Sequence, residues 1–291
     1  MKVIDFLKSQ EPTLSFEVFP PKTESSYKTV EDAVEKIADL KPSYMSVTYG
    51  AGGGTSAHTV SIAKHIQCDK KISAIAHLSC ISSTKQLVHS QLEQLKAAGI
   101  ENILALRGDL PEGFSTENLE YHYASDLIKE IRDFGDFCIG GACYPEGHPE
   151  SPNSNVDIDN LKKKIDAGCQ YLTTQMFFDN NIHYKFLYKA REKGITVPII
   201  PGIMPITNAK QVERAIKLSG TIMPQRFLSI VDRFGDDNEA MLQAGIAYAT
   251  DQIIDLFANG INHIHIYSMN KPIVAQKLLE NLSSIIKWKA E

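Results

Sequence analysis

Eight short apolar runs, separated by segments with helical spacing, constrain the fold of this chain more than any other feature. Each run is too short for a helix and is bounded by charged residues, glycine or proline, which is typical of a buried strand. The run at 103–106, for example, ends in Arg107, Gly108 and Asp109, where Gly108 permits a tight turn and Pro111 stops further pairing. The predicted strands cover residues 13–19, 43–49, 72–78, 103–106, 137–144, 170–178, 197–204 and 262–267.

A helical segment follows each of these strands. The predicted helices cover 25–40, a stretch ending at 66, 84–98, 124–134, 157–167, 184–193, several helices within 208–259, and 272–288. Strictly alternating strands and helices indicate a parallel sheet with crossover helices. Eight units in 291 residues favour an α/β fold, a (β/α)8 TIM barrel forming a single domain over 1–291, with an open doubly wound sheet as the alternative.

Composition narrows the class of protein further. The chain is 43% hydrophobic and 22% charged with a formal net charge of −5, which is ordinary for a soluble protein and predicts no nucleic-acid partner. The amino terminus lacks the apolar core of a signal peptide, and no apolar run reaches the roughly 18 residues of a membrane span. We therefore expect a cytoplasmic protein without a membrane partner, whose five cysteines are reduced core thiols.

Polar side chains gather at the carboxyl ends of six consecutive strands. They are Glu17, Thr48, His77, Arg107, Asp109, Tyr144, His148 and Gln175. In a (β/α)8 barrel these ends open onto one face, and polar groups there do not fill the core. The sequence therefore predicts a functional site at this mouth.

Glu17 is the most informative member of the set. It lies among Phe16, Val18 and Phe19, where desolvation would raise its pKa, as suits a general acid. A carboxylate paired with a Lys or Arg is an equally good interpretation of the same run. For Asp109 the alternative to a functional role is a structural ion pair with the neighbouring Arg107.

Two other patterns point to cofactors less directly. The glycines within 50–54 match neither a Rossmann fingerprint nor a Walker loop, so they predict a βα loop. His263 and His265 stand two apart on a predicted strand and share one face, which would allow a zinc site in a metal-dependent hydrolase. No third ligand is evident, so we predict no metal.

Several motifs, in order along the chain, resemble the methylenetetrahydrofolate reductase family. They are Ser15-Phe16-Glu17, Phe19-Pro20-Pro21-Lys22-Thr23, Ser46-Val47-Thr48-Tyr49-Gly50, Ala105-Leu106-Arg107-Gly108-Asp109-Leu110-Pro111, Tyr144-Pro145-Glu146, His148-Pro149-Glu150, Asp166-Ala167-Gly168, Thr174-Gln175, Phe177-Phe178-Asp179 and Ile200-Pro201-Gly202-Ile203-Met204-Pro205. The length is similar to the short bacterial form, which has no regulatory domain.

This resemblance implies an FAD-containing barrel that reduces 5,10-methylenetetrahydrofolate to 5-methyltetrahydrofolate and so supplies methyl groups for methionine synthesis. NADH or NADPH would reduce the flavin and leave before folate enters, in a ping-pong sequence. A homo-oligomer acting on small molecules is the expected assembly.

Residue roles follow from the matching motif positions. Glu17 would be the general acid, and Asp109 would lie near the flavin ring and contact the folate pterin. The resemblance assigns FAD contacts to Thr48, Tyr49, Ala51, His77, Arg107, Gly108, Asp109, Ala124, Tyr144, His148, Asp157, Asn160, Lys163 and Lys164. It assigns substrate contacts to Asp109, Gln175, Gln211 and Lys271.

The sequence departs from the family pattern at three places. Ala215 stands where bacterial relatives have a stacking aromatic, with Leu218 as a nearby substitute. Lys271 replaces a common Arg and cannot bind a carboxylate bidentately. The segment 112–123 is longer than expected. A non-catalytic or partner-dependent subunit is a further alternative, since some relatives work in complexes.

Overall fold

The computed structural model describes residues 1–21, 23–49, 56–109 and 119–289. Within these ranges, one sheet holds nine parallel segments in the order β7-β6-β5-β4-β3-β2-β1-β9-β8. Apart from β7 and β8, strands that are consecutive in the chain are thus neighbours in the sheet, as the alternating pattern predicted. The strands are β1 (Thr13–Val18), β2 (Tyr44–Val47), β3 (Ser73–Ser79), β4 (Asn102–Leu106), β5 (Cys138–Cys143), β6 (Tyr171–Thr174), β7 (Ile199–Ile200), β8 (Gly202–Ile203) and β9 (His263–Tyr267).

The segments β7 and β8 are two halves of the seventh predicted strand, and Pro201 separates them. β7 pairs with β6, while β8 pairs with β9 through Gly202 and His265. The His265 backbone N–H donates to the Pro201 carbonyl at 2.9 Å, so the proline, which has no N–H of its own, still joins the ladder as an acceptor. The two halves therefore close the sheet into a (β/α)8 barrel, and the open-sheet alternative is wrong.

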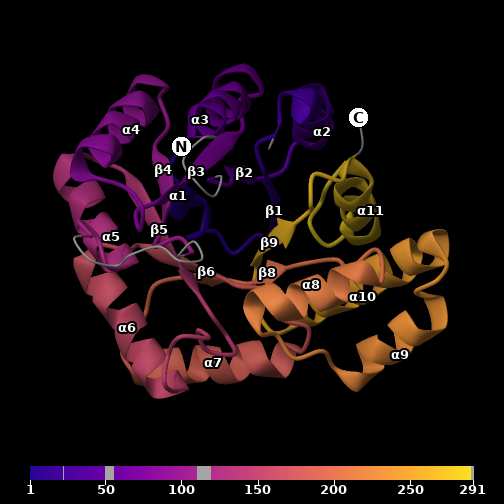
Figure 1. Cartoon of the computed structure of the whole chain (residues 1–291). Coiled ribbons are helices and arrows are strands. Elements are labelled where there is room, and N and C mark those ends of the chain that lie inside the picture. The colour runs from indigo at the N-terminus through magenta and orange to yellow at the C-terminus, as the bar shows by residue number, and fades with distance from the viewer. Residues whose placement is uncertain (22, 50–55, 110–118, 290–291) are drawn as a thin grey trace.

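Helices surround the barrel on its outer side (Figure 1). They are α2 (Tyr27–Asp39), α3 (Ser56–Lys64), α4 (Lys85–Ala97), α5 (Ala124–Phe134), α6 (Ser154–Ala167), α7 (Asn180–Glu192), α8 (Lys210–Ser219), α9 (Gln225–Phe234), α10 (Asn238–Ala258) and α11 (Pro272–Leu282). A short π-helical turn, His65–Asp69, extends α3 beyond its predicted end. No helix in the described ranges combines the length and apolar character that a membrane crossing requires.

One helix was not predicted from the sequence. The short α1 (Val3–Phe6) closes the amino-terminal end of the barrel, where the Val3 backbone N–H donates to Asn102 Oδ1 at 2.7 Å. Val3 and Leu7 pack inside against Tyr44 and Ile75. A helix of four residues is too short to show a hydrophobic periodicity in the sequence.

The sixth strand is shorter than the predicted 170–178. Phe177 and Phe178 leave the sheet, and their carbonyls accept hydrogen bonds from side chains of α10: Gln252 donates at 3.0 Å and Tyr248 at 2.6 Å. Both phenylalanine side chains are buried, in different clusters. The apolar run reflects burial against helices rather than continued strand pairing.

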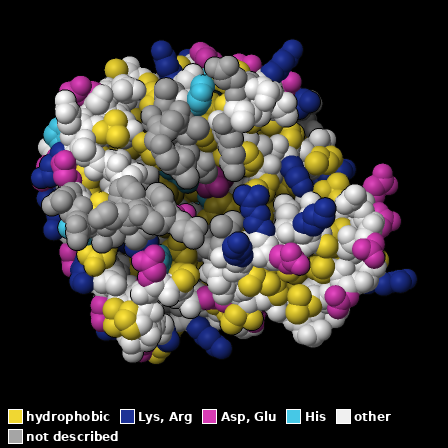
Figure 2. Space-filling view, viewed as in Figure 1, with side chains coloured by type: hydrophobic (Ala, Val, Ile, Leu, Met, Phe, Trp, Pro, Cys, Tyr) yellow, Lys and Arg dark blue, Asp and Glu magenta, His cyan; other side chains and the backbone are white. Residues whose placement is uncertain are grey.

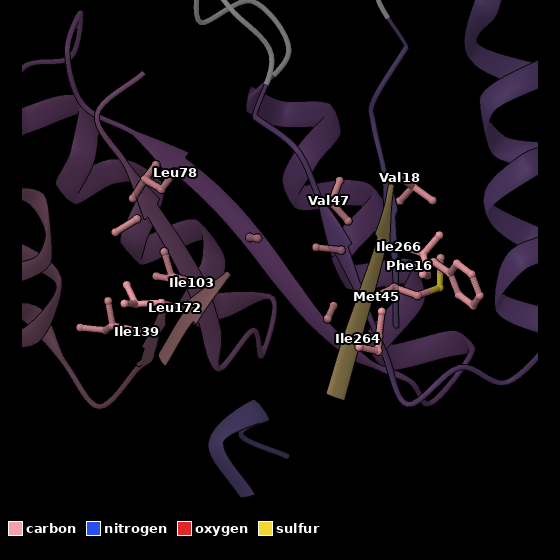
Figure 3. Packing of buried hydrophobic residues seen from close by; sticks show 14 of the residues in the cluster. Phe16, Val18, Met45, Val47, Leu78, Ile103, Ile139, Leu172, Ile264 and Ile266 are labelled. Atoms are coloured by element: carbon pink, nitrogen blue, oxygen red, sulfur yellow. The ribbon is translucent and has the colours of Figure 1, made fainter. Parts of the chain in front are cut away.

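The main core lies between sheet and helices. Phe16, Val18, Met45, Ile264 and Ile266 pack there at less than 1% exposure (Figure 3). Because side chains alternate along a strand, the residues between them face the barrel interior. On β1, for example, Ser15 and Glu17 alternate with Phe16 and Val18 and therefore point into the barrel.

All five cysteines are free thiols, in agreement with the prediction. Cys80, Cys138, Cys143 and Cys169 are buried, whereas Cys68 is only partly buried.

Candidate active site

The carboxyl ends of the strands open onto a face that is hollowed near its centre (Figure 2). Acidic side chains lie inside the hollow, and Lys and Arg side chains gather along one side of it. The predicted mouth residues can therefore be placed one by one around this hollow.

Glu17 lies near the carboxyl end of β1, in register with Ser46 of β2 and Tyr267 of β9. Its side chain is 20% exposed, and Oε2 lies 3.7 Å from His77 Nε2. Burial raises the pKa of the Glu17 carboxyl to about 8. No Lys or Arg ion pair with Glu17 is found in the described part of the chain. Of the two interpretations of Glu17, the geometry favours the desolvated acid.

His77 is the buried neighbour of Glu17. Its side chain is 6% exposed, and burial lowers its pKa to about 3, so the imidazole is neutral at physiological pH. Nε2 has no hydrogen-bond partner among the described residues. A buried polar nitrogen without a partner is uncommon in folded proteins and points to a ligand that satisfies it.

Below this pair, a hydrogen-bonded group fills the barrel interior. His265 Nδ1 lies 2.8 Å from Ser15 Oγ, and Nε2 lies 3.0 Å from Ser46 Oγ. The ring also stacks on Tyr44, with centroids 6.0 Å apart. Burial lowers the pKa of His265 to about 3, so it serves as a neutral packed residue.

The ring nitrogens of His263 also have hydrogen-bond partners, so they are not free to bind the zinc ion considered in the sequence analysis. Its Nδ1 lies 2.9 Å from Thr13 Oγ1, and its Nε2 lies 3.1 Å from the Ser9 carbonyl oxygen. Both nitrogens of both histidines are therefore engaged. The described ranges contain no group of three or more His, Cys, Asp or Glu that could hold a metal.

Arg107 follows β4 and is held by Glu150. Its two terminal nitrogens contact the two carboxylate oxygens, with Nη2 at 2.7 Å from Oε1. The partner is thus Glu150 rather than Asp109, which is exposed. Gly108 turns the chain with φ +89°, and an added Cβ would lie 3.2 Å from Ser79 Cβ, so a glycine is required here.

Tyr144 follows β5 and is influenced by both Asp109 and Gln175. Burial raises the pKa of the Tyr144 phenol, the Asp109 carboxylate raises it further, and a hydrogen bond with Gln175 opposes the shift. His148 packs edge-on against Tyr144, with ring centroids 4.6 Å apart. The structure thus brings four predicted site residues together.

Asp157 supports this loop from α6. It is 7% exposed and accepts hydrogen bonds from the His148 N–H at 3.3 Å and from Ser151 Oγ at 3.1 Å. Its visible role is to shape the loop that carries Tyr144 and His148.

The two predicted lysines of α6 point to different surroundings. Lys164 is largely buried and donates from Nζ to the Ala142 carbonyl at 2.8 Å, and burial lowers its pKa. Lys163 is exposed and donates to Asn160 Oδ1 at 2.9 Å. The two side chains therefore lie in different environments, one buried and one exposed.

Three further predicted cofactor positions lie around the same rim. The Thr48 backbone N–H donates to the Val18 carbonyl at 3.0 Å. The Tyr49 hydroxyl accepts from Gln91 Nε2 of α4 at 2.5 Å, and Ala124 is buried at the first turn of α5.

Gln211 and Lys271 converge on Thr207, just before α8. Gln211 Oε1 accepts from the Thr207 N–H at 2.7 Å and from Thr207 Oγ1 at 3.1 Å. Lys271 Nζ donates to Thr207 Oγ1 at 2.6 Å. The two predicted substrate residues therefore share one polar contact.

Comparison with known proteins agrees with this arrangement. The profile of the family described as methylenetetrahydrofolate reductase matches residues 2–283. The 5,10-methylenetetrahydrofolate reductase of Escherichia coli K12 is 35% identical over 269 residues, covering 92% of this chain and 90% of that protein. The chain belongs to the methylenetetrahydrofolate reductase family.

Other relatives show the extent of the likeness. The Pectobacterium carotovorum enzyme of the same name is 34% identical, covering 92% of this chain and 89% of its own. Methylenetetrahydrofolate reductase (NADH) 1 of Arabidopsis thaliana is 36% identical over 98% of this chain, which spans only 51% of the plant protein. The likeness to bacterial members thus covers nearly their full length.

A solved structure supports the fold. An uncharacterized Clostridium thermocellum protein, described as binding two copies of 5-methyl-5,6,7,8-tetrahydrofolic acid, aligns with a TM-score of 0.67 at 18% identity. The alignment covers 97% of this chain and 98% of that one. At this identity the likeness shows the barrel architecture alone.

Two of the three departures from the family pattern concern Ala215 and the segment 112–123. Ala215, at the site of the family's aromatic, is 1% exposed and packs inward with Val212. Ala51, the loop 50–55 and most of the segment 112–123 lie outside the described residues, and the Leu218 side chain is not described.

Sequence reasoning missed residues that complete the site. Tyr267 is in register with Glu17 and donates from its hydroxyl to the Thr174 carbonyl at 2.6 Å. Glu146 accepts from Thr221 Oγ1 at 2.6 Å and from the Ile222 N–H at 2.9 Å. Strand alternation from His265 would have placed Tyr267 inside the barrel, whereas nothing local indicates the partners of Glu146.

Proposed function

We propose that this chain reduces 5,10-methylenetetrahydrofolate to 5-methyltetrahydrofolate, using NADH or NADPH and a bound FAD. Family membership supports the reaction class. The observation that carries the proposal is the desolvated Glu17 carboxyl, with a pKa of about 8, at the mouth of the barrel. An acid that keeps its proton at neutral pH is the group that ring opening needs.

Glu17 acts as the general acid. Breaking a C–N bond of the five-membered ring leaves its electron pair on nitrogen, and the proton of Glu17 neutralises that nitrogen. The remaining carbon becomes an iminium cation, which accepts two electrons and a proton in the reduction. General acid catalysis of this kind typically contributes 10²–10⁴-fold in rate.

The residues at the mouth fit FAD. His77 is buried, and its Nε2 has no hydrogen-bond partner among the described residues. Arg107 presents a guanidinium held by Glu150, next to the tight turn at Gly108. When bound, FAD would supply the two-electron redox chemistry of the proposed reaction. The groups that would hold it are Thr48, Tyr49, Ala51, His77, Arg107, Gly108, Asp109, Ala124, Tyr144, His148, Asp157, Asn160, Lys163 and Lys164.

Asp109 stabilises positive charge developing on the folate. Its carboxylate is close enough to Tyr144 to raise the pKa of that phenol. A fixed negative group beside a forming cation lowers the barrier without reorganisation of its own.

Folate is held by Gln175, Gln211 and Lys271. Gln175 is hydrogen-bonded to Tyr144, while Gln211 and Lys271 both contact Thr207, just before α8. These positions would hold the pterin at one end and the glutamate carboxylates at the other. The product would supply methyl groups for methionine synthesis, and the enzyme would act as a homo-oligomer.

An anaerobic flavin titration tests the proposal. NADH and then NADPH are added to the purified holoprotein while the oxidised-flavin band is recorded, and methylenetetrahydrofolate is added to the reduced protein. Bleaching by one nucleotide and recovery with folate are expected. Bleaching without recovery would leave a flavin reductase that does not use folate, and a protein that refuses FAD would overturn the proposal. Turnover by the isolated chain would also dispose of the partner-dependent alternative.

A further inference from the structure

The residues that follow β9 form a turn that packs against the carboxyl end of β1. Backbone pairing between these two strands ends at the rung of Glu17 and Tyr267, which carries the proposed general acid. Beyond this rung, side chains of the turn bind the β1 backbone in place of a neighbouring strand. The first is Ser268, which is 1% exposed and whose Oγ donates to the Glu17 carbonyl oxygen at 2.8 Å. We call residues 268–271 the β9 turn.

Asn270 of the β9 turn continues this pairing at Phe19. Its Oδ1 accepts from the Phe19 N–H at 3.0 Å, and its Nδ2 donates to the Phe19 carbonyl oxygen at 2.9 Å. One side-chain amide thus satisfies both backbone groups of Phe19, as a strand partner would. On the opposite side of β1, the Thr48 N–H donates to the Val18 carbonyl at 3.0 Å. The backbone of residues 17–19 is therefore held from both sides.

The β9 turn keeps Asn270 in this place through an uncommon backbone conformation. Met269 and Asn270 have φ values of +54° and +52°, in the left-handed region that residues other than glycine rarely adopt. Asparagine tolerates this region, whereas methionine does so only where the surrounding structure holds it. Met269 packs against a buried cluster that includes Ala215, and the Lys271 N–H closes the turn on the Ser268 carbonyl at 3.0 Å. The fold itself thus directs the Asn270 amide toward β1.

We propose that Asn270 is a positioning residue for the Glu17 carboxyl, acting through its two bonds to the Phe19 backbone. The inference rests on the proposed role of Glu17 as general acid. Pro20 and Pro21 follow Phe19 and have no N–H to donate, so they are poorly suited to continue the sheet. Asn270 therefore provides the last hydrogen bonds between β1 and the β9 turn among the described residues, two positions beyond the acid.

The environment of Glu17 provides a readout of its position. The titratable groups that the structure places against it are His77 of β3, with Nε2 at 3.7 Å, and Tyr267 of β9. Burial raises the pKa of the Tyr267 phenol, and the Glu17 carboxylate raises it further. A Glu17 carboxyl that moves toward solvent should regain a pKa nearer its ordinary value of 4.5. A residue that only stabilised the barrel would leave that pKa unchanged.

Removing the Asn270 amide should slow the folate half-reaction and spare the nicotinamide half-reaction. A displacement of about 1 Å can cost about 10²-fold in rate, so N270A should reduce the limiting rate of flavin reoxidation by methylenetetrahydrofolate about 10–100-fold. Flavin reduction by NADH should stay within about twofold of wild type. N270G should behave like N270A, because glycine adopts the left-handed backbone without strain but makes no bond to Phe19. A wild-type rate in N270G, or equal losses in both half-reactions, would overturn the inference.

Combination with E17Q shows whether Asn270 acts through Glu17. E17Q has no acidic proton, so adding N270G to it should change the folate rate by less than about twofold, because no acid is left to position. A further loss as large as that of N270G alone would overturn the inference. A rise in KM for folate without a change in limiting rate would do the same, since it would place the effect at the neighbouring Lys271.

The control variant is Q170A, which removes another amide that bonds a neighbouring strand. Gln170 precedes β6 at the end of the barrel opposite the mouth, and its Oε1 accepts from the Ile139 N–H of β5 at 3.0 Å. Q170A should keep the folate rate within about twofold of wild type. A loss in Q170A equal to that in N270A would show a general effect of weakened strand contacts and would overturn the inference.

Unfolding measurements test the inference without folate. E17Q should raise the folding constant more at pH 8 than at pH 5, because the folded wild type retains a proton on Glu17 that the unfolded chain releases. In the N270G background this pH-dependent gain should be smaller by about threefold or more, since Glu17 reaches solvent. An equal gain in both backgrounds would overturn the inference. A smaller gain in a protein that does not reduce methylenetetrahydrofolate would support the positioning of Glu17 while the proposed function falls.

Discussion

The carboxylate of Glu17 lies 3.7 Å from Nε2 of His77, and no other ion pair of either group is found among the residues that the structure describes. Burial pushes their pKa values in opposite senses, that of Glu17 up to about 8 and that of His77 down to about 3. Both side chains are therefore neutral at pH 7: Glu17 is a protonated carboxyl that can donate its proton, and His77 is a neutral imidazole rather than a cation. This arrangement suits acid chemistry rather than an ion pair.

Replacing Glu17 by Gln should separate the two half-reactions. E17Q keeps the shape of the side chain but has no acidic proton, so reduction of methylenetetrahydrofolate should fall about 10²–10⁴-fold. The rate of NADH oxidation by E17Q with a quinone acceptor should stay within about twofold of the wild-type rate. Stopped-flow measurement of each half-reaction checks this, and equal losses in both would contradict the assigned role.

The same substitution should stabilise the protein. Because the folded pKa of Glu17 is raised above its ordinary value of 4.5, the folded state holds a proton that the unfolded state releases between pH 4.5 and about 8. Stability is thus lost as pH rises through this window. E17Q should gain roughly 1–3 kcal/mol in free energy of unfolding at pH 8 relative to wild type. Denaturant unfolding of E17Q and wild type at pH 5 and pH 8 tests this prediction. If the stability difference between them is the same at both pH values, the Glu17 carboxyl does not have a raised pKa.

The folate half-reaction should depend on pH through Glu17. Only the protonated carboxyl can donate, so the rate should fall with a slope of about tenfold per pH unit above pH 8. The NADH half-reaction should lack this limb. A folate rate that rises through pH 8 would show that the catalytic acid is a different group.

The pair Arg107 and Glu150 offers a test of the cofactor site. If Arg107 served only Glu150, R107K and E150Q would have the same effect, since an exposed pair contributes about 1 kcal/mol or less. We expect R107K to weaken FAD retention about tenfold or more and E150Q less than threefold. Equilibrium dialysis of flavin from each variant distinguishes the two cases.

Glu146 should act by positioning the end of α8. Its carboxylate accepts from Thr221 Oγ1 at 2.6 Å and from the Ile222 N–H at 2.9 Å, tying the loop after β5 to the loop after α8. E146A should raise the KM for folate about threefold to tenfold, with little change in flavin reduction, and T221V should show a smaller rise because one of two bonds remains. A change in flavin reduction as large as that in KM would indicate general unfolding of the site instead.

Local pattern determined the architecture. Short apolar runs alternating with helical segments require parallel strands and crossover helices, and chain direction alone sends Glu17, His77 and Gln175 to one end of the sheet. The order of the strands and the character of the mouth could therefore be predicted. Strand ends were less certain, because Phe177 and Phe178 are as apolar as strand residues but are buried against α10.

Only the tertiary structure decided which partners these residues have. Arg107 meets Glu150, 43 residues away, rather than neighbouring Asp109, and Lys271 meets Thr207 across the closing strands. The barrel closes because Pro201 divides one strand between two partners, which no local signal gives. The pKa of Glu17 likewise depends on the burial created by side chains from several strands. Periodicity is a property of a segment, whereas desolvation and pairing are properties of the space between segments, so the first can be predicted from sequence and the second requires the fold.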